Sequence, residues 1–534
     1  MNNYKRFTAP IFQQLSKHAD EKPVSFHVPG HRYGEAWKQH GHNHNNGLLE
    51  REAADRFGRL LPIDVTELST TDDLHAPEGV IAEAQRLAAA MYGADETMLL
   101  VGGSTAGNIA MILAACEPGD TIIVQRNVHK SVINGLRMAG AKAVFVRPSY
   151  EASDGTAIIP RLGDIENALK QYPEAKAVLL STPNYYGYAT SINLYAELAH
   201  RHGVPLLVDE AHGAHYGLHE AFPHSALSQG ADAVVQSTHK TLPAMTMGAM
   251  LHVRRGRIDM ERLREMLTMV QSSSPSYPIM ASLDIARAMA ESAGGLMFES
   301  GLAAAERIRG HLYSRAGRLS IGDNRLKEES MIASMPIRQQ GERKQQSLPL
   351  NNKHEMKVRQ DPLRIVIRDR LSLVSGYELQ RMLESHGCWA EMADERRVLL
   401  IVGPFISDED TARFIAACEA IEKELNNREQ PEQKSESFAN IYGEGEELLA
   451  VSEPVPFSLH RINRDLIDTL PLQEATGCRS AETVIPYPPG IPLVYAGETI
   501  TAGIVTELES LSARGAKVQG AANPKLQTIR IIRS

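Results

Sequence analysis

The chain has 534 residues, which is too long for one ordinary domain, and its 56 basic and 65 acidic residues give a net charge of −9. This mildly acidic balance gives no sign of nucleic-acid binding and argues against anionic membranes. The four cysteines are scattered without CxxC spacing, as is typical of reduced thiols rather than of disulfides or a zinc site. The first residues are polar, and no run approaches the roughly 20 apolar residues of a membrane span. We therefore expect a cytoplasmic protein.

Between residues 80 and 255, short apolar segments alternate with segments of helical spacing. The apolar segments predict strands at 98–101, 121–124, 143–146, 177–180, 205–209, 233–236 and 250–253. Helices are predicted at 106–116, 165–170 and 192–202. Nearly all-apolar strands separated by helices indicate an α/β fold with a mostly parallel sheet covered on both faces. Ligands bind beyond the carboxyl ends of the strands in such sheets, so the residues that follow each strand are examined first.

Two polar stretches interrupt this pattern. Residues 326–362 resemble a solvated insertion or linker, and residues 424–438 form a second polar spacer. Strands at 363–367 and 398–402 with a helix at 376–386 predict a small α+β unit, which a rigid turn at 487–492 and a helix at 503–514 follow. We expect four regions: an N-terminal segment 1–75, a large domain 76–325, the insertion 326–362 and a small α+β C-terminal region 363–534.

Lys240 follows the strand 233–236 by four residues, in the segment Ser237-Thr238-His239-Lys240. A lysine that binds pyridoxal 5′-phosphate (PLP) must reach an aldehyde while neighbouring hydroxyl, imidazole or backbone N–H groups hold a phosphate. Ser237 and His239 are suited to holding the phosphate. Taken alone, a surface lysine after a strand explains these four residues at least as well.

A glycine-rich turn, residues 102–108, follows the strand 98–101 and opens a helix. Its glycines allow the backbone to approach an anion, the helix start offers unsatisfied N–H groups, and Ser104 and Thr105 add hydroxyl donors. The turn matches neither the Walker loop nor the GxGxxG dinucleotide motif. An ordinary helix cap would look similar.

Asp209 ends the strand 205–209, where a carboxylate could keep a pyridine nitrogen protonated, or could simply cap the next turn. Glu210, His212 and His215 lie close by in sequence, but their spacing lacks a recognised metal motif such as HExxH, so we predict no metal. His129 follows the strand 121–124 and could stack on a cofactor ring, although a single loop histidine is more often solvated.

Together these residues resemble the aspartate-aminotransferase-like (fold type I) PLP enzymes and, more narrowly, the Orn/Lys/Arg decarboxylase family. The resemblance covers nearly the whole chain outside the polar stretches. It rests on segments 27–31 (HVPGH), 64–68 (DVTEL), 72–75 (DDLH), 103–105 (GST), 129–131 (HKS), 209–215 (DEAHGAH), 236–240 (QSTHK), 274–278 (SPSYP) and 486–490 (PYPPG).

The family resemblance implies roles for these side chains. Lys240 would hold PLP as a Schiff base, Asp209 would pair with the pyridinium nitrogen, and His129 would stack on the ring. His212 would lie beside the ring or its phenolic oxygen. A phosphate shell would be formed by Ser104, Thr105, Ser237 and His239. The large domain would then be the PLP-binding domain.

The sequence also departs from the large members of this family. Those members carry an N-terminal wing domain, whereas here the HVPGH segment already begins at residue 27, and Lys240 is followed by Thr-Leu-Pro as in shorter members. Decamers built through a wing domain are therefore doubtful. A homodimer or a higher homo-oligomer is expected, because active sites of this fold form at a subunit interface.

The expected reaction is PLP-dependent decarboxylation of a basic L-amino acid in polyamine biosynthesis. Arginine to agmatine is favoured over lysine to cadaverine and ornithine to putrescine, and Lys240 or His239 would return the proton to Cα. Glu498 is a candidate for contacting the distal group of the substrate, although an exposed turn residue is an equal alternative.

Two other functions remain open. An aminotransferase would use Lys240 to move a proton, but the sequence shows no typical C-terminal arginine motif that binds an α-carboxylate. A non-catalytic PLP-binding protein is the second alternative. A regulator would need a DNA-binding module, which the sequence before residue 27 does not show, and a degenerate subunit would lack the lysine or the aspartate, both of which are present.

Overall fold

The computed structural model describes residues 6–41, 48–151, 155–314, 317–321, 358–428, 450–486, 491–513 and 517–533. Its main sheet has eight strands. They are β1 (Glu96–Leu100), β2 (Thr121–Gln125), β3 (Lys142–Val146), β6 (Val178–Ser181), β8 (Leu206–Asp209), β9 (Ala233–Gln236), β10 (Ala249–Val253) and β16 (Val451–Pro456). The strand order is β1-β10-β9-β8-β6-β2-β3-β16.

The centre of this sheet is parallel. Strands β9, β8, β6, β2 and β3 pair in parallel, whereas β10, β1 and β16 are attached antiparallel at the two sides. All the strands predicted between residues 98 and 253 are present within one or two residues of their predicted ends. The predicted α/β class with a mostly parallel sheet is confirmed.

Helices cover both faces of the sheet because alternate apolar side chains of each strand point to opposite sides. In β2, Ile122 and Val124 belong to one core and Ile123 to the other. The first core is covered by α5 (Gly103–Ala115), α6 (Lys130–Ala139) and α10 (Met260–Val270). The second is covered by α7 (Leu162–Gln171) and α8 (Asn193–Arg201). The three predicted helices of this region correspond to α5, α7 and α8.

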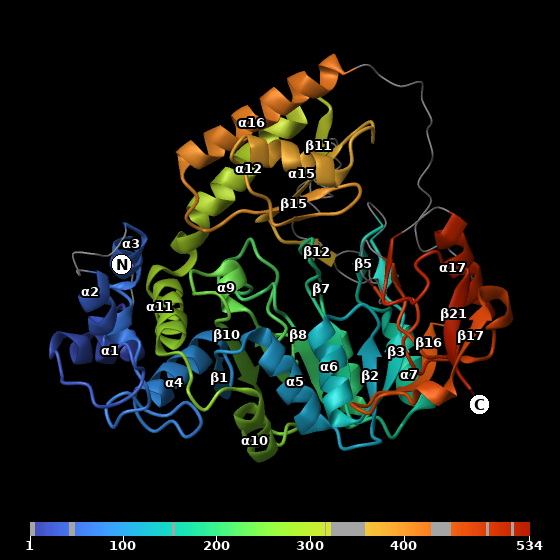
Figure 1. Ribbon diagram of the computed structural model, residues 1–534, viewed down its shortest axis with the longest axis horizontal. Helices are drawn as coiled ribbons and strands as arrows, with labels where there is room; N and C mark the ends of the chain where they lie inside the picture. The colour runs from blue at the N-terminus through green and yellow to red at the C-terminus, as the bar shows by residue number, and fades with distance from the viewer. Residues whose placement is uncertain are drawn as a thin grey trace, which may run out of the picture.

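An N-terminal helical layer packs beside β1, drawn in blue at the left of Figure 1. It comprises α1 (Pro10–Asp20), α2 (Glu35–Gly41), α3 (Leu48–Phe57), η1 (Leu61–Ile63) and α4 (Val80–Tyr92), with α11 (Tyr277–Ala293) and η2 (Gly294–Phe298) following later in the chain. Buried Asp284 accepts a hydrogen bond from Ile11 N at 2.9 Å and pairs with Arg287 at 2.8 Å. The hydrogen bond between Ile11 and Asp284 attaches α1 to α11.

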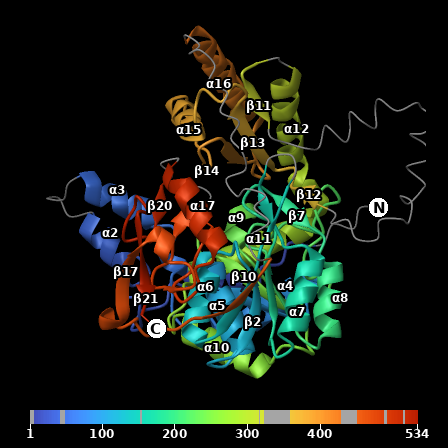
Figure 2. The same cartoon turned by 90° about the vertical axis from the view of Figure 1, so that its right-hand side faces the viewer.

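A small domain lies above the sheet in Figures 1 and 2. It contains α12 (Glu299–Ser314), β11 (Leu319–Ile321), β13 (Arg364–Asp369), α15 (Gly376–Ser385), β14 (Met392–Ala393), β15 (Val398–Ile401) and α16 (Asp408–Asn427). Its sheet has the order β11-β13-β15-β14. A separate pairing of β12 (Val358–Gln360) with β7 (Tyr188–Thr190) connects the start of β13 to the large domain.

The C-terminal part, red in Figure 1, has a core of its own. Its elements are η3 (Arg464–Leu466), β17 (Ile467–Pro471), η4 (Leu472–Glu474), β18 (Arg479–Ser480), β19 (Ile485–Pro486), α17 (Ala502–Ala513), β20 (Val518–Gln519) and β21 (Thr528–Ile532). A short hairpin, β4 (Ser149–Tyr150) and β5 (Ala157–Ile158), lies between β3 and α7.

The sheets join strands across the region boundaries that the sequence predicts near residues 325 and 363. β11 precedes the polar insertion yet belongs to the small-domain sheet, β12 lies inside the predicted insertion, and β16 joins the main sheet. The region predicted as one small domain, 363–534, therefore contributes to three units. Residues 487–490 of the predicted rigid turn lie outside the described residues.

Candidate active site

The predicted site residues follow strands that end at one edge of the main sheet. Asp209 is the last residue of β8, and His129 comes soon after β2. Lys240 lies in the short helix α9 (Thr238–Thr241) directly after β9. The glycine-rich turn follows β1, which runs in the same direction as β9 because two antiparallel pairings separate them. The sheet topology therefore brings these segments together, as expected for such a sheet.

The amine of Lys240 lies beside the imidazole of His212. Lys240 Nζ is 3.0 Å from His212 Nε2, and His212 is 7 % exposed. Burial lowers the pKa of the Lys240 amine, and the positive charge of Arg364 acts in the same direction while Asp209 opposes it. A lowered pKa increases the fraction of uncharged, nucleophilic amine near neutral pH.

A hydrogen-bonded chain joins Asp209 to His129. Asn108 Nδ2 donates to Asp209 Oδ2 at 2.8 Å and to Ser131 Oγ at 3.0 Å. Ser131 Oγ in turn lies 2.8 Å from His129 Nδ1, and the Ser131 backbone N–H also donates to that nitrogen. Burial lowers the pKa of His129, which favours a neutral ring. The chain fixes the carboxylate and the imidazole relative to each other.

The proposed phosphate side of the site is built on the turn before α5. Gly103 has a φ of 71°, a region that favours glycine, and its N–H donates to Met247 O at 2.9 Å. Ser237 Oγ donates to Ser104 Oγ at 2.8 Å, so these two predicted hydroxyls are adjacent. Thr105 is exposed in the first turn of α5. His239 Nδ1 lies 2.8 Å from Gly248 O, which orients its ring.

Glu498 has both carboxylate oxygens engaged by other groups. Arg126 Nη1 and Nη2 each donate to one oxygen at 2.8 Å, and the N–H of Tyr495 donates to Oε2. Glu498 is 7 % exposed, and it does not line the cavity beside Lys240. Both oxygens therefore already accept hydrogen bonds from the protein, and the predicted contact of Glu498 with substrate stays a prediction. These hydrogen bonds attach the C-terminal part to the loop that precedes His129.

The other side chains of the Asp209 turn have partners within the protein. Glu210 accepts hydrogen bonds from Gln236 Nε2 at 2.7 Å and from Ala226 N at 2.7 Å. His215 Nε2 lies 3.0 Å from Asp361 Oδ2, and both residues are fully buried. Within the described ranges, no group of three or more His, Cys, Asp or Glu side chains could hold a metal ion.

A cavity of about 380 Å³ lies between the large and small domains beside Lys240. It is lined by His215 and Lys240 from the large domain, and by Asp361, Arg364 and residues 401–406 from the small domain side. Because both domains line it, a small molecule bound there would contact both.

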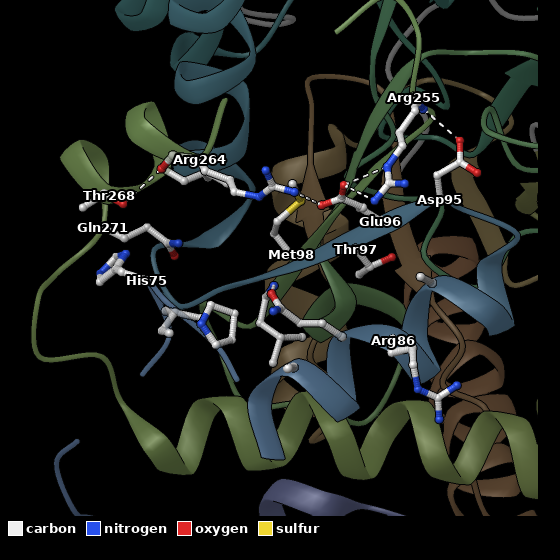
Figure 3. A pocket seen from close by; sticks show the side chains of 17 residues that line it. His75, Arg86, Asp95, Glu96, Thr97, Met98, Arg255, Arg264, Thr268 and Gln271 are labelled. Atoms are coloured by element: carbon white, nitrogen blue, oxygen red, sulfur yellow. Dashed lines mark hydrogen bonds and ion pairs between the residues drawn. The ribbon is translucent and has the colours of Figure 1, made fainter. Parts of the chain in front are cut away.

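A second cavity, of about 410 Å³, lies near β1, α4 and α10 and is shown in Figure 3. Glu96 lies between Arg255 and Arg264, Asp95 accepts a hydrogen bond from Arg255 N, and Arg86 pairs with Glu83 outside the cavity lining. The cavity lacks the lysine, histidines and aspartate of the first site, so we assign the chemistry to the cavity beside Lys240.

Two segments of the chain match one protein family. Residues 9–410 match the major domain of the Orn/Lys/Arg decarboxylases, and residues 454–522 match their C-terminal domain. The chain belongs to the Orn/Lys/Arg decarboxylase family. It is an amino-acid decarboxylase, a carboxy-lyase, as the sequence predicts, and its family acts on basic amino acids.

Similar proteins match this decarboxylase over nearly its full length. The uncharacterized protein YaaO of Bacillus subtilis is 40% identical over 512 residues, 96% of each chain. An arginine decarboxylase of B. subtilis is 32% identical, with 98% of each chain covered. The structure of the lysine decarboxylase LdcF from Francisella novicida has a TM-score of 0.74 at 19% identity, with 98% of this chain and 81% of that one covered, and supports the fold.

In the described parts of the decarboxylase, no helix is both long and apolar enough to cross a membrane.

Two residues of the site were not singled out from the sequence. Asn108 could have been noticed as a polar residue within the apolar helix 106–116. Arg364 could have been noticed as a charge next to the apolar run of β13, but its contact with His212, 152 positions earlier in the chain, depends on the tertiary fold.

Proposed function

We propose that this decarboxylase uses PLP bound at Lys240 to convert arginine to agmatine, with lysine and ornithine as the next substrates to test. The observation that carries the proposal is the juxtaposition of the Lys240 amine, His212 and the Asn108-supported Asp209 at one end of the sheet. Agmatine production would place the enzyme in polyamine biosynthesis.

The residues present fit the cofactor. Asp209 is a carboxylate only 4 % exposed, and the hydrogen bonds described for its oxygens come from neutral donors, the Asn108 amide and the Ala211 N–H. A buried carboxylate without a counterion is costly, and a protonated pyridine nitrogen would neutralise it. The adjacent hydroxyls of Ser104 and Ser237 and the backbone N–H groups that follow Gly103 in the first turn of α5 suit a phosphate.

When bound, PLP would accept the electron pair released as the Cα–carboxylate bond breaks. The protein's own groups divide the remaining work. Asp209 would hold the proton on the pyridine nitrogen, and His129, fixed by Ser131, would stack on the ring. Lys240 would bind the cofactor through its uncharged amine and, once released, could return a proton to Cα. His239 is the alternative donor.

Arginine is favoured by the relatives. Arginine decarboxylases of Bacillus and Halalkalibacterium species are 29 to 32% identical over at least 92% of this chain. The lysine decarboxylase LdcA of Pseudomonas aeruginosa matches 54% of this chain at 28% identity. Family membership also favours decarboxylation over the aminotransferase and the non-catalytic alternatives.

We also propose a homodimer and a cytoplasmic location. Val24 and Phe26, just before the HVPGH segment, and Val28 within it are 71%, 96% and 63% exposed, which is typical of a surface that a second subunit covers. All four cysteines are free, as expected in a reducing compartment. Sedimentation analysis would test the dimer.

The activity test supplies PLP with arginine, lysine and ornithine separately, and measures CO₂ and the product of each reaction. We expect CO₂ and agmatine in equal amounts, fastest with arginine. A keto acid without CO₂ would contradict the proposal in favour of aminotransfer, and the absence of any product would favour a binding role.

A further inference from the structure

Arg364 of the small domain contacts the active-site histidine from the side opposite to Lys240. Arg364 is the first residue of β13 and is 1 % exposed. Its Nη2 lies 3.3 Å from His212 Nδ1 and 3.5 Å from His212 O. The other ring nitrogen of His212, Nε2, lies 3.0 Å from Lys240 Nζ. One imidazole therefore connects the guanidinium to the reactive amine.

The direction of these hydrogen bonds follows from the chemistry of the guanidinium. Arginine has N–H donors and no acceptor, so His212 Nδ1 must accept and cannot carry a proton. The proton of the neutral ring then lies on Nε2 and points to Lys240. An uncharged amine can accept that hydrogen bond, whereas an ammonium group cannot.

We propose that Arg364 is a positioning residue that holds His212 in the tautomer with its proton on Nε2, so that the imidazole donates to the uncharged Lys240 amine. The proposal rests on the proposed function in one respect, namely that Lys240 is the lysine that binds PLP. With the opposite tautomer, Nε2 would accept a hydrogen bond from Lys240 and stabilise its ammonium form.

The charges around His212 act in the same direction. Burial is the largest cause that lowers the pKa of His212 well below its usual value, and Arg364 is the next. Three further groups add to this lowering: Lys240, His129 and His239. The ring is therefore neutral near pH 7, which is the condition under which its tautomer matters.

The Lys240 amine experiences opposing charges. Burial and Arg364 lower its pKa, while Asp209 and Glu391 raise it. The carboxylate nearest to Arg364 is Asp361, at 3.6 Å from Nε, but Asp361 is also 3.0 Å from His215. The Asp361 carboxylate is thus shared between Arg364 and His215, and the positive charge of Arg364 still lowers the pKa of both Lys240 and His212.

The fold fixes the Arg364 side chain in this position. A Cβ at Gly187 would lie 2.5 Å from Arg364 Cγ and 3.0 Å from Asp361 Cβ, so only glycine allows this approach. Asp361 N donates to Gly187 O at 2.9 Å, and the pairing of β12 with β7 sets the register of the segment.

The first test reads the tautomer directly. The apoprotein is labelled with ¹⁵N-histidine, and the ring signals of His212 are assigned with a His212→Asn variant. We expect the His212 proton on Nε2 in the wild-type protein, and a mixture or a shift to Nδ1 in Arg364→Met. A wild-type ring protonated on Nδ1 would overturn the proposal. This measurement needs neither PLP nor turnover, so its failure is distinct from failure of the proposed function.

The second test follows attachment of PLP to the apoprotein by absorbance between pH 6 and 10. Arg364→Met should slow PLP attachment at pH 7 about tenfold, since more Lys240 is then an ammonium group. The midpoint of the attachment profile, which is the rate of PLP attachment plotted against pH, should move up by about one pH unit. Arg364→Lys keeps a donor-only cation and should stay within about threefold of wild type.

Arg359→Met is the matched control, because Arg359 donates to Ala221 O and Phe222 O between the domains without contacting His212. It should leave the attachment profile unchanged. If Arg359→Met shifts the profile as Arg364→Met does, the effect is structural and the proposal is overturned. It is also overturned if Arg364→Met keeps the wild-type profile and only raises KM for every substrate, because Arg364 would then be a site for the α-carboxylate.

Discussion

The side-chain amide of Asn108 donates a hydrogen bond of 2.8 Å to Asp209 Oδ2, across 101 positions of sequence. Both residues are buried, and the same amide reaches Ser131, which contacts His129. A residue in the interior of α5 thus sets the orientation of the carboxylate that would face the cofactor.

Asn108→Ala should weaken PLP binding by about 10- to 100-fold, because a hydrogen bond to a buried charged group contributes about 1.5–3 kcal/mol. The PLP dissociation constant is measured by titrating the apoprotein. Asn167→Ala, at an exposed position of α7, is the control and should bind PLP as wild type does. Equal affinity of the Asn108 and Asn167 variants would contradict the role of Asn108.

Glu210 should make the stability of the fold depend on pH. Burial raises its pKa to about 8 from 4.5, so between these values the folded protein keeps a proton that the unfolded chain has lost. The free energy of unfolding therefore falls as the pH rises from 4.5 to about 8, by up to about 1.4 kcal/mol per pH unit.

Glu210→Gln removes this titration. The free energy of unfolding of the variant should therefore fall short of the wild-type value by less and less as the pH rises from 5.5 to 7.5. Urea unfolding at each pH gives the difference in free energy of unfolding. Glu197→Gln, exposed on α8, should keep the wild-type slope. A Glu210→Gln deficit that stays constant with pH would show that this carboxylate does not titrate in the range.

Glu498→Gln should destabilise the attachment of the C-terminal part and leave substrate binding unchanged. Breaking a buried pair such as Arg126–Glu498 typically costs about 3–5 kcal/mol. The expected signs are faster limited proteolysis and a KM for arginine within about twofold of wild type. A KM raised tenfold or more without faster proteolysis would restore the substrate contact predicted from the sequence.

Gly187→Ala should be strongly unfavourable. The residue has a φ of 86°, and the added Cβ would overlap Arg364 Cγ. Overpacking of this kind typically costs about 1–3 kcal/mol, with backbone strain in addition. Gly163→Ala in α7, where a Cβ meets nothing within 4 Å, should be neutral or stabilising in the same unfolding assay. Equal stability of both variants would contradict the tight packing around Arg364.

The main sheet was predictable from the sequence because its strands are short, apolar and separated by helices. The same pattern located Lys240, Asp209 and His129, since residues after parallel strands meet at one edge. The contacts from distant segments were not predictable. Arg364 lies 152 positions from His212 in sequence. The sequence around Glu498 does not indicate that Arg126 pairs with both of its oxygens.

Local sequence patterns also could not predict which strands of the C-terminal half belong to which sheet. β11 is three residues long and precedes the polar insertion, and only its pairing with β13 shows that it belongs to the small domain. β16 contains two prolines and joins the edge of the main sheet through an irregular register. Such short and irregular strands carry little sequence signal.

The most direct test of the central claim is to reduce the PLP-loaded enzyme with borohydride and map the modified peptide by mass spectrometry. The account predicts one pyridoxyl group, located on Lys240, and none in a Lys240→Ala variant. A pyridoxyl group on a different lysine, or a Lys240→Ala protein that still decarboxylates arginine at the wild-type rate, would contradict it.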